Sequence, residues 1–352
     1  MSIAAQWTPL DLDFAFEAVT SRERMWHRRT YLVRVWDTSA PQVRGVGECG
    51  LFRGLSADDT PDYEERLAEW CSHPEDWRGC TMPSVRFGLE TAFADLAAGG
   101  RRNWTDNNDW LDGRTGIPIN GLIWMGDRNT MFRRIQEKIE AGFKVLKLKI
   151  GGINFEEEVE LLRYIRSRFG ADELEIRLDA NGSMSPADAP GRLERLSAFD
   201  IHSIEQPVRA GLTDVMARLC RTSPVAIALD EELIGWKEPS EMEELLTAIR
   251  PQHIILKPSL IGGFEVVENY VALCRRHNIG WWLTSALESN VGLNAIAQWT
   301  ATEMSRGAIV PQGLGTGMLY TNNISSPLTM RGGSLCHKPG AAWGDLNALP
   351  WR

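Results

Sequence analysis

The segment LEIRLD at 174–179 decides the fold, because a short apolar run ends there on a carboxylate and the same pattern recurs along the chain. Comparable runs are INGLIW (119–124), KVLKLKI (144–150), IHSIEQ (201–206), VAIALD (225–230), HIILK (253–257), IGWWLT (279–284) and AIVPQG (308–313). Most stretches between them carry the apolar spacing of an amphipathic helix. Eight strands alternating with seven helices predict parallel pairing and an α/β fold closed as a modified TIM barrel, (β/α)7β.

An open doubly wound sheet is the alternative architecture for the same alternation of strands and helices. In such sheets, a GxGxxG turn after the first strand is typical of a dinucleotide-binding site. No such turn follows INGLIW in this sequence. The closed barrel is therefore the preferred interpretation.

Outside the repeating region the pattern changes, which predicts three parts for the 352 residues. Residues 1–115 lack the strand–helix alternation but contain strand-like runs, a GVGECG stretch at 45–50 and a helical segment at 84–98. They predict a small N-terminal α+β domain. The barrel is expected over 116–313. Residues 314–352, rich in Gly, Asn and Pro, are expected to pack back on the barrel and the N-terminal domain.

Composition and charge exclude several classes of protein. Hydrophobic residues make up 43% and charged residues 24% of the chain, as in ordinary globular proteins. The net charge of -9 argues against nucleic-acid or anionic-membrane partners, which reward clustered Lys and Arg. We see neither a membrane span nor a signal peptide at the N-terminus. Six scattered cysteines without a CxxC pair indicate reduced thiols and a cytoplasmic protein.

Three successive predicted strands end on an acidic residue: Asp179, Glu205 and Asp230. The carboxyl ends of barrel strands surround the active site, so these carboxylates are expected at one level. Without a cation, like charges in a small volume would force protonation. All-oxygen ligation favours a hard divalent ion, so the sequence predicts Mg²⁺, with Mn²⁺ as the alternative. Helix capping is the competing explanation, and it accounts for one such acid more readily than for three.

Three lysines are placed to reach the same site. Lys147 and Lys149 are two residues apart in the second predicted strand, so their side chains share a face. Their mutual repulsion, roughly 2.4 kcal/mol at about 7 Å and a dielectric of about 20, lowers their pKa. The carboxylates act in the opposite sense, and the sequence does not fix the net sign. Lys257 ends the sixth strand, which lies opposite the second, so it is expected to face Lys149 across the opening.

Taken together, these residues resemble the enolase superfamily, in its muconate lactonizing enzyme-like branch. The resemblance covers nearly the whole chain, and its motifs are specific in combination. They are PSVRFGLETA (83–92), KLK (147–149), RLDAN (177–181), SIEQP (203–207), ALDE (228–231) and the lysine of ILKPS at 257. The resemblance implies that residues 1–115 form an α+β capping domain with substrate-specificity loops.

The resemblance implies an enzyme that removes a proton beside the carboxylate of a small-molecule substrate and stabilises the resulting enolate with Mg²⁺. The three acids would hold the ion. Lys149 would act as base, with Lys147 beside it and Lys257 over the opposite face of the substrate. Phrases such as ILKPSLIGGF (255–264) and GLGTGMLYTNN (313–323) resemble dehydratases of that branch and imply loss of water.

The substrate contacts are less specified. The resemblance implies Asn181, Ser285 and the backbone of Gly313 as candidate substrate-binding groups, and it assigns substrate choice to the segment SRERMWHRR (21–29). Two facing lysines suit racemisation of an N-acylamino acid or epimerisation of a dipeptide equally well. A non-catalytic barrel that binds a ligand is the remaining alternative. It predicts a lost ligand residue or lysine, and none is lost.

Overall fold

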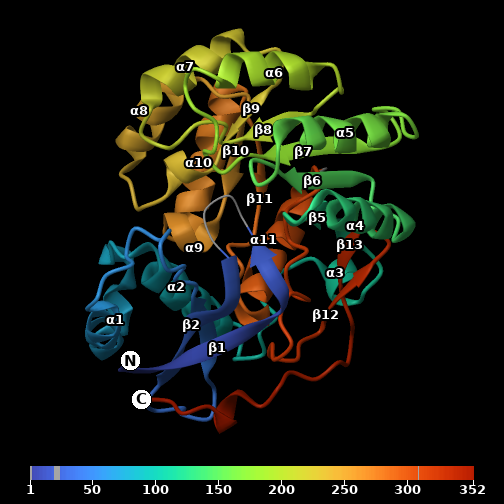
Figure 1. The fold of residues 1–352 in the computed structure, drawn as a ribbon. Helices are drawn as coiled ribbons and strands as arrows, with labels where there is room; N and C mark the ends of the chain where they lie inside the picture. The colour runs from blue at the N-terminus through green and yellow to red at the C-terminus, as the bar shows by residue number, and fades with distance from the viewer. Residues whose placement is uncertain (1, 20–23, 308) are drawn as a thin grey trace.

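The computed structural model describes residues 2–19, 24–307 and 309–352. Seven parallel strands form one curled sheet in the order β11-β10-β9-β8-β7-β6-β5 (Figure 1). They are β5 (Gly121–Ile123), β6 (Val145–Lys149), β7 (Glu175–Asp179), β8 (Ser203–Glu205), β9 (Ile227–Leu229), β10 (His253–Leu256) and β11 (Gly280–Leu283). Each lies within a predicted apolar run. The predicted α/β barrel fold is confirmed.

The eighth predicted strand, 308–313, closes the barrel without forming a regular strand. Isolated parallel bridges join Gln312 to Ile119 and Gly313 to Thr284, at the two edges of the seven-stranded sheet. Pro311 has no N–H to donate, so a regular ladder is not available here. Instead the Gln312 side chain accepts the Leu283 N–H at 2.7 Å. The prediction that 308–313 forms a regular strand was therefore wrong. Ala308 lies outside the described residues.

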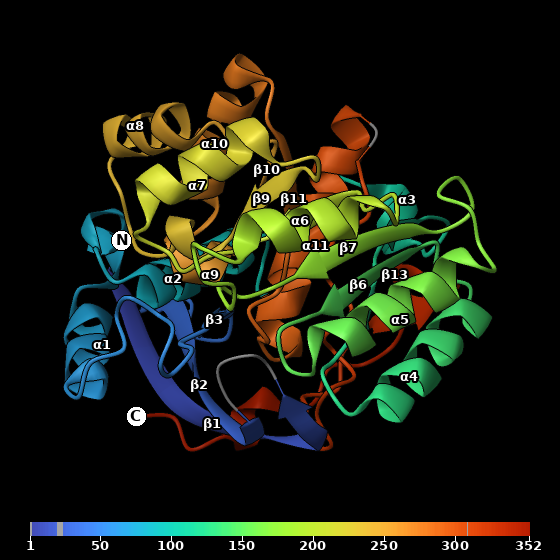
Figure 2. The same cartoon turned by 45° about the horizontal axis from the view of Figure 1, so that its top comes forward.

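Helices cover the outer face of the sheet (Figure 2). They are α4 (Arg128–Glu140), α5 (Phe155–Arg166), α6 (Ala189–Ser197), α7 (Thr213–Thr222), α8 (Pro239–Ile249), α10 (Phe264–His277) and α11 (Asn290–Arg306), with a short α9 (Pro258–Ile261) after β10. Asp127, Asn154 and Ser289 begin three of them by accepting a first-turn N–H, the preferred N-cap chemistry. No described helix is long and apolar enough to cross a bilayer.

The N-terminal part is an antiparallel sheet packed against helices. Its elements are β1 (Ile3–Val19), β2 (Arg24–Asp37), β3 (Gly45–Cys49), α1 (Tyr63–Ser72), the 3₁₀ helix η1 (Pro74–Gly79), α2 (Pro83–Ala97) and α3 (Asn108–Leu111). Helix α2 lies so close to β3 that a Cβ on Gly47 would be 2.0 Å from the Gly88 carbonyl oxygen. Glycine at both positions therefore permits this contact.

The C-terminal segment contacts both other parts. Strands β12 (Leu328–Arg331) and β13 (Ser334–His337) form a sheet with β4 (Gly116–Pro118), and the 3₁₀ helix η3 (Leu346–Ala348) follows. The Arg352 N–H donates to the Trp7 carbonyl at 2.9 Å. The predicted division of the chain at 115 and 313 stays an interpretation of these contacts.

Glu48 joins the N-terminal sheet to the barrel. This β3 side chain is fully buried and accepts the backbone N–H groups of Ser289 and Gly292, each at 2.9 Å. It also accepts the hydroxyls of Thr30 and Ser289. Burial raises the pKa of the Glu48 carboxyl, although the hydrogen bonds from Ser289 oppose this. A carboxylate from one part of the molecule thus caps the first turn of α11 in another.

Candidate active site

The strand register sets the acidic and basic side chains beside one another. Lys149 of β6 pairs with Asp179 of β7, and Asp179 pairs with Glu205 of β8. Neighbouring strands lie about 4.8 Å apart, so these side chains leave the sheet at one level. Asp230 directly follows β9, and Lys257 directly follows β10. Five consecutive strands therefore contribute charged groups to the same end of the barrel.

The lysines and carboxylates form an ion-pair network. Lys147 Nζ lies 3.0 Å from Asp179 Oδ2 and 2.6 Å from Glu205 Oε2. Lys149 Nζ donates to Asp179 Oδ2 and to Asn181 Oδ1, each at 2.9 Å.

Across the opening, Lys257 Nζ donates to Asp230 Oδ2. Three ammonium groups thus face three carboxylates, and their formal charges cancel.

Burial and pairing together set the pKa values in this network. Burial disfavours the charge on Lys147, but the attraction of Asp179 and Glu205 outweighs it and raises the Lys147 pKa. Burial is likewise outweighed by Asp230 at Lys257, whose pKa is raised. Burial opposes ionisation of Asp179 as well, but the neighbouring lysines hold its pKa low. Burial and then the charge of Asp179 raise the pKa of Glu205. Glu205 is therefore a carboxyl whose charge is incompletely compensated.

The three acids are the candidate metal ligands. Across residues 2–19, 24–307 and 309–352, no three His, Cys, Asp or Glu side chains are grouped as they would be around one ion. The reason is visible in the network, where ammonium groups occupy the carboxylate oxygens. One oxygen, Glu205 Oε1, is buried and has no hydrogen-bond partner among the described residues. An all-carboxylate donor set with such an oxygen fits a hard divalent cation.

A cavity opens directly above this network. Lys147, Lys149, Asp179 and Lys257 form its floor, so the two predicted opposing lysines do line one space. Its walls are Phe52, Leu55, Asn120, Leu122, Trp124, Asn181, Leu260, Thr284, Ser285, Ala286, Leu287, Gly313, Gly315 and Thr316. Phe52 and Leu55 come from the N-terminal part, which thereby covers the barrel mouth.

Sequence reasoning missed several polar atoms of the cavity wall. Asn120 Oδ1, Trp124 Nε1, Thr284 Oγ1 and Thr316 Oγ1 are buried and have no hydrogen-bond partner among the described residues. Buried polar groups without partners are costly, so these atoms are suited to a polar ligand. Thr284 directly follows β11. The strand-end rule that found the acids would therefore have found it too.

The three predicted substrate contacts all line the cavity, but their groups are already engaged. Asn181, at a positive φ of 44°, accepts from Lys149 and donates to Glu231 Oε1 at 3.1 Å. The Ser285 hydroxyl donates to Glu288 at 2.5 Å. The Gly313 N–H donates to the Leu283 carbonyl at 2.7 Å. Gly313 nevertheless has to be glycine, since a Cβ there would lie 2.2 Å from Thr284 Oγ1.

The predicted specificity segment 21–29 is only partly described, because residues 20–23 lie outside the described residues. The remainder belongs to β2 rather than to a loop. Arg28 is buried there and donates to the carbonyls of Gly50 and Leu51 at 3.1 and 3.0 Å. These bonds hold the segment 50–55 that carries Phe52 and Leu55 over the cavity.

Known proteins resemble this chain in sequence and fold. Residues 130–342 match the family described as enolase C-terminal domain-like. The o-succinylbenzoate synthase of Desulfotalea psychrophila is 44% identical over 92% of this chain and 96% of that protein. The chain belongs to the enolase superfamily, among the o-succinylbenzoate synthases. The crystal structure of MenC from the same organism, 41% identical, has a TM-score of 0.80 and covers 96% of this chain and all of its own. The predicted superfamily is confirmed, and so is the prediction of an enzyme.

Other superfamily members are more distant. An N-succinylamino acid racemase from Amycolatopsis is 29% identical over 56% of this chain and 51% of its own length. A dipeptide epimerase structure from Enterococcus faecalis, with Mg and a dipeptide, has a TM-score of 0.82 over 98% of this chain and 99% of its own at 18% identity. At that identity the likeness shows the fold alone.

Proposed function

We propose that the protein dehydrates 2-succinyl-6-hydroxy-2,4-cyclohexadiene-1-carboxylate to o-succinylbenzoate in menaquinone biosynthesis. Whole-length similarity to a synthase of that name supports this activity. That similarity carries the choice of reaction, and the pair Lys149 and Lys257, which line one cavity together with an acidic network, supplies the chemistry. Such a pair can remove a proton on one face of a substrate and support the resulting negative charge from the other.

In this mechanism Lys149, as its neutral amine, takes on Nζ the proton beside the ring carboxylate. The electron pair delocalises into that carboxylate, and the ammonium of Lys257 stabilises the anion from the opposite face. Lys149 then gives a proton to the departing hydroxyl on its own face, so water leaves syn to the abstracted proton. Asn181 orients Lys149 through the bond to its Nζ. The apolar wall formed by Phe52, Leu55 and Leu122 excludes water.

Asp179, Glu205 and Asp230 would hold a divalent ion, Mg²⁺ or Mn²⁺; the dipeptide epimerase structure from Enterococcus faecalis is a complex with Mg. The bound ion would supply positive charge beside the substrate carboxylate, which is worth several kcal/mol in such reactions. Charge balance agrees with this in direction. With Lys149 as a neutral amine, the cations of Lys147 and Lys257 leave one of the three carboxylates uncompensated, so a divalent ion would give the site the net positive charge that favours a dicarboxylate substrate.

The test is to follow aromatisation of the cyclohexadiene by ultraviolet absorbance, with protein first stripped by EDTA. We expect no turnover without metal and recovery when Mg²⁺ is added. Calorimetric titration of the stripped protein with MgCl₂ gives a second readout, in which Glu205→Gln weakens binding while leaving the size of the side chain unchanged. Turnover at full rate in EDTA would remove the metal from the mechanism.

Racemisation of an N-succinylamino acid is the second candidate, because facing lysines also suit a two-base reaction. Proton NMR in D₂O distinguishes the two. Rapid exchange of the α-proton of an N-succinylamino acid, without aromatisation of the cyclohexadiene, would reverse the assignment.

A further inference from the structure

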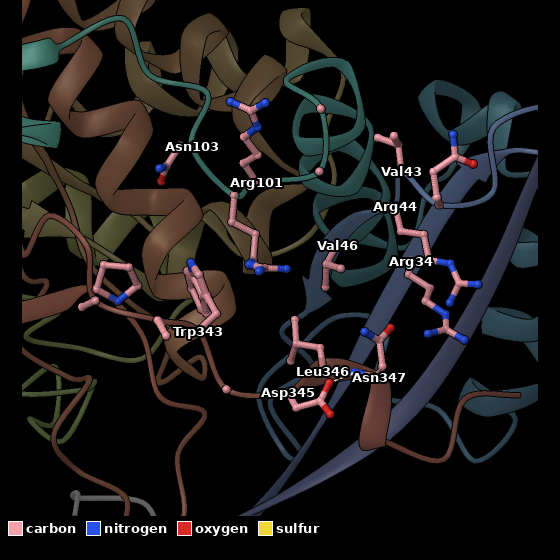
Figure 3. Close-up of a pocket in the computed structure, with 18 of the residues that line it drawn as sticks. Arg34, Val43, Arg44, Val46, Arg101, Asn103, Trp343, Asp345, Leu346 and Asn347 are labelled. Atoms are coloured by element: carbon pink, nitrogen blue, oxygen red, sulfur yellow. Dashed lines mark hydrogen bonds between the residues drawn. The ribbon is translucent and has the colours of Figure 1, made fainter.

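A second cavity lies away from the barrel mouth, and its volume is about 880 Å³. It is enclosed by β2 and the turn before β3, by the segment after α2, and by the C-terminal segment (Figure 3). It shares no lining residue with the catalytic cavity. Its lining includes Arg34, Arg44, Arg101 and Arg102, and we refer to it as the arginine hollow.

The arginine hollow carries more positive than negative charge. Asp345 is the acidic residue of its lining, and one of its oxygens already accepts the Asn347 N–H at 2.9 Å. Asp95 does not line the hollow. It attracts Arg102, but its two carboxylate oxygens already accept the backbone N–H groups of Val46 and Arg102. The lining thus contains four arginines and one partly engaged carboxylate. A chain with a net charge of -9 has concentrated cations here.

Aromatic rings, rather than acids, support three of these guanidinium groups. The pairs are Arg34 over Trp351 at 4.4 Å, Arg44 over Trp36 at 5.3 Å and Arg102 over Trp343 at 4.9 Å, measured to the ring centroid. A cation held on a ring face keeps its N–H groups, which lie in the guanidinium plane, for other acceptors. The three groups are therefore positioned without being neutralised.

The pairing of Arg34 shows the same shortage of negative charge. Its Nε and Nη2 both donate to the Gln6 side-chain oxygen, at 3.0 and 2.6 Å, which is a neutral acceptor. Burial and the nearby charge of Arg44 lower the pKa of Arg34 to about 10. Arg102 Nε is buried and has no hydrogen-bond partner among the described residues. Elsewhere arginines such as Arg195 form two-pronged bonds to a carboxylate.

We propose that the arginine hollow binds a small organic anion with at least two negative charges. Guanidinium groups recognise planar carboxylates and phosphates through paired N–H donors. The volume of the hollow falls within the range typical of small-molecule sites, roughly 300–1,000 Å³. Phosphate esters and polycarboxylates share the required chemistry. The site shares no lining residue with the catalytic cavity, so a ligand bound here does not occupy the place of the reacting substrate.

Isothermal titration calorimetry of the full chain tests the proposal. The probes are glycerol 3-phosphate and tricarballylate, at an ionic strength held constant with NaCl. We expect saturable binding of at least one probe with a Kd on the order of 1 mM or tighter. Tighter binding of glycerol 3-phosphate identifies a phosphate ester, and tighter binding of tricarballylate identifies a polycarboxylate.

Variants locate the site. Arg44→Gln and Arg101→Gln are expected to weaken binding about tenfold or more, which is about 1.4 kcal/mol, while turnover stays at the wild-type rate. Arg218→Gln removes an exposed arginine from α7 and serves as the matched control. The proposal is overturned if neither probe binds, if Arg44→Gln and Arg101→Gln bind like the wild type, or if Arg218→Gln loses as much affinity.

Discussion

The catalytic cavity and the arginine hollow both gather cations, but they treat the charge in opposite ways. In the cavity, Lys147 and Lys257 each meet a carboxylate, and the network is buried. In the hollow, Arg34 and Arg44 lie on indole rings and have no carboxylate partner among the described residues. The paired charges of the cavity are therefore expected to matter for both folding and chemistry. The arginines of the hollow are held on aromatic rings without a counter-charge, which suits them to bind an anionic ligand.

Removing the proposed base gives the largest expected effect and sharpens the comparison on the side of chemistry. Lys149→Ala should lower turnover at least ~10³-fold, within the range for loss of a general acid–base group. Its fold should persist, since Asp179 keeps its ion pair with Lys147. Ultraviolet aromatisation measures turnover, and circular dichroism monitors the fold. Lys144→Ala, an exposed lysine at the start of the same strand segment, should act like the wild type. Retained activity in Lys149→Ala would withdraw its role.

The second-largest effect is expected from removing Lys147, which should lower the free energy of unfolding. Lys147→Met leaves Asp179 and Glu205 buried without their shared cation, which in comparable buried pairs costs about 3–4 kcal/mol. Urea unfolding in EDTA measures the loss. Added Mg²⁺ should stabilise Lys147→Met more than the wild type, because the ion would compensate the same carboxylates. An unchanged urea midpoint in EDTA would show that the network does not contribute to folding.

The smallest effect is expected in the arginine hollow. Arg44→Gln removes a cation that repels Arg34 and has no ion pair with a described residue, although it also loses the contact with Trp36. The free energy of unfolding should therefore change by no more than about 0.5 kcal/mol. The same urea titration provides the measurement. A loss as large as that of Lys147→Met would erase the distinction between the two regions and make the hollow a structural feature.

Much of the barrel could be predicted because its strands are short apolar runs, several of which end on a charged residue. The strand-end rule then brought Asp179, Glu205 and Asp230 to one level, since the carboxyl ends of parallel barrel strands lie at the same end of the barrel. Strands β12 and β13 were missed, although Gly332-Gly333 between them is a local hairpin signal. The pairing of β13 with β4, more than two hundred residues away in sequence, has no such local sign.

Side-chain partners were harder to predict than positions. The sequence placed Lys147 and Lys149 on one face, but it did not show that both ammonium groups lie on Asp179. It offered Ser285 as a substrate contact, yet that hydroxyl serves Glu288. The arginine hollow was missed entirely, because its residues come from three distant segments that share no motif.

The bond between Glu48 and the start of α11 limits how this architecture can be recombined. A chimera that joins the N-terminal sheet of one relative to the barrel of another would need an acidic residue at the position of Glu48. Without it, two first-turn amides and the Ser289 hydroxyl would lose their acceptor inside the protein, and each such loss costs about 1–3 kcal/mol. Exchange of substrate-covering segments is therefore expected to succeed only when the junction preserves this carboxylate.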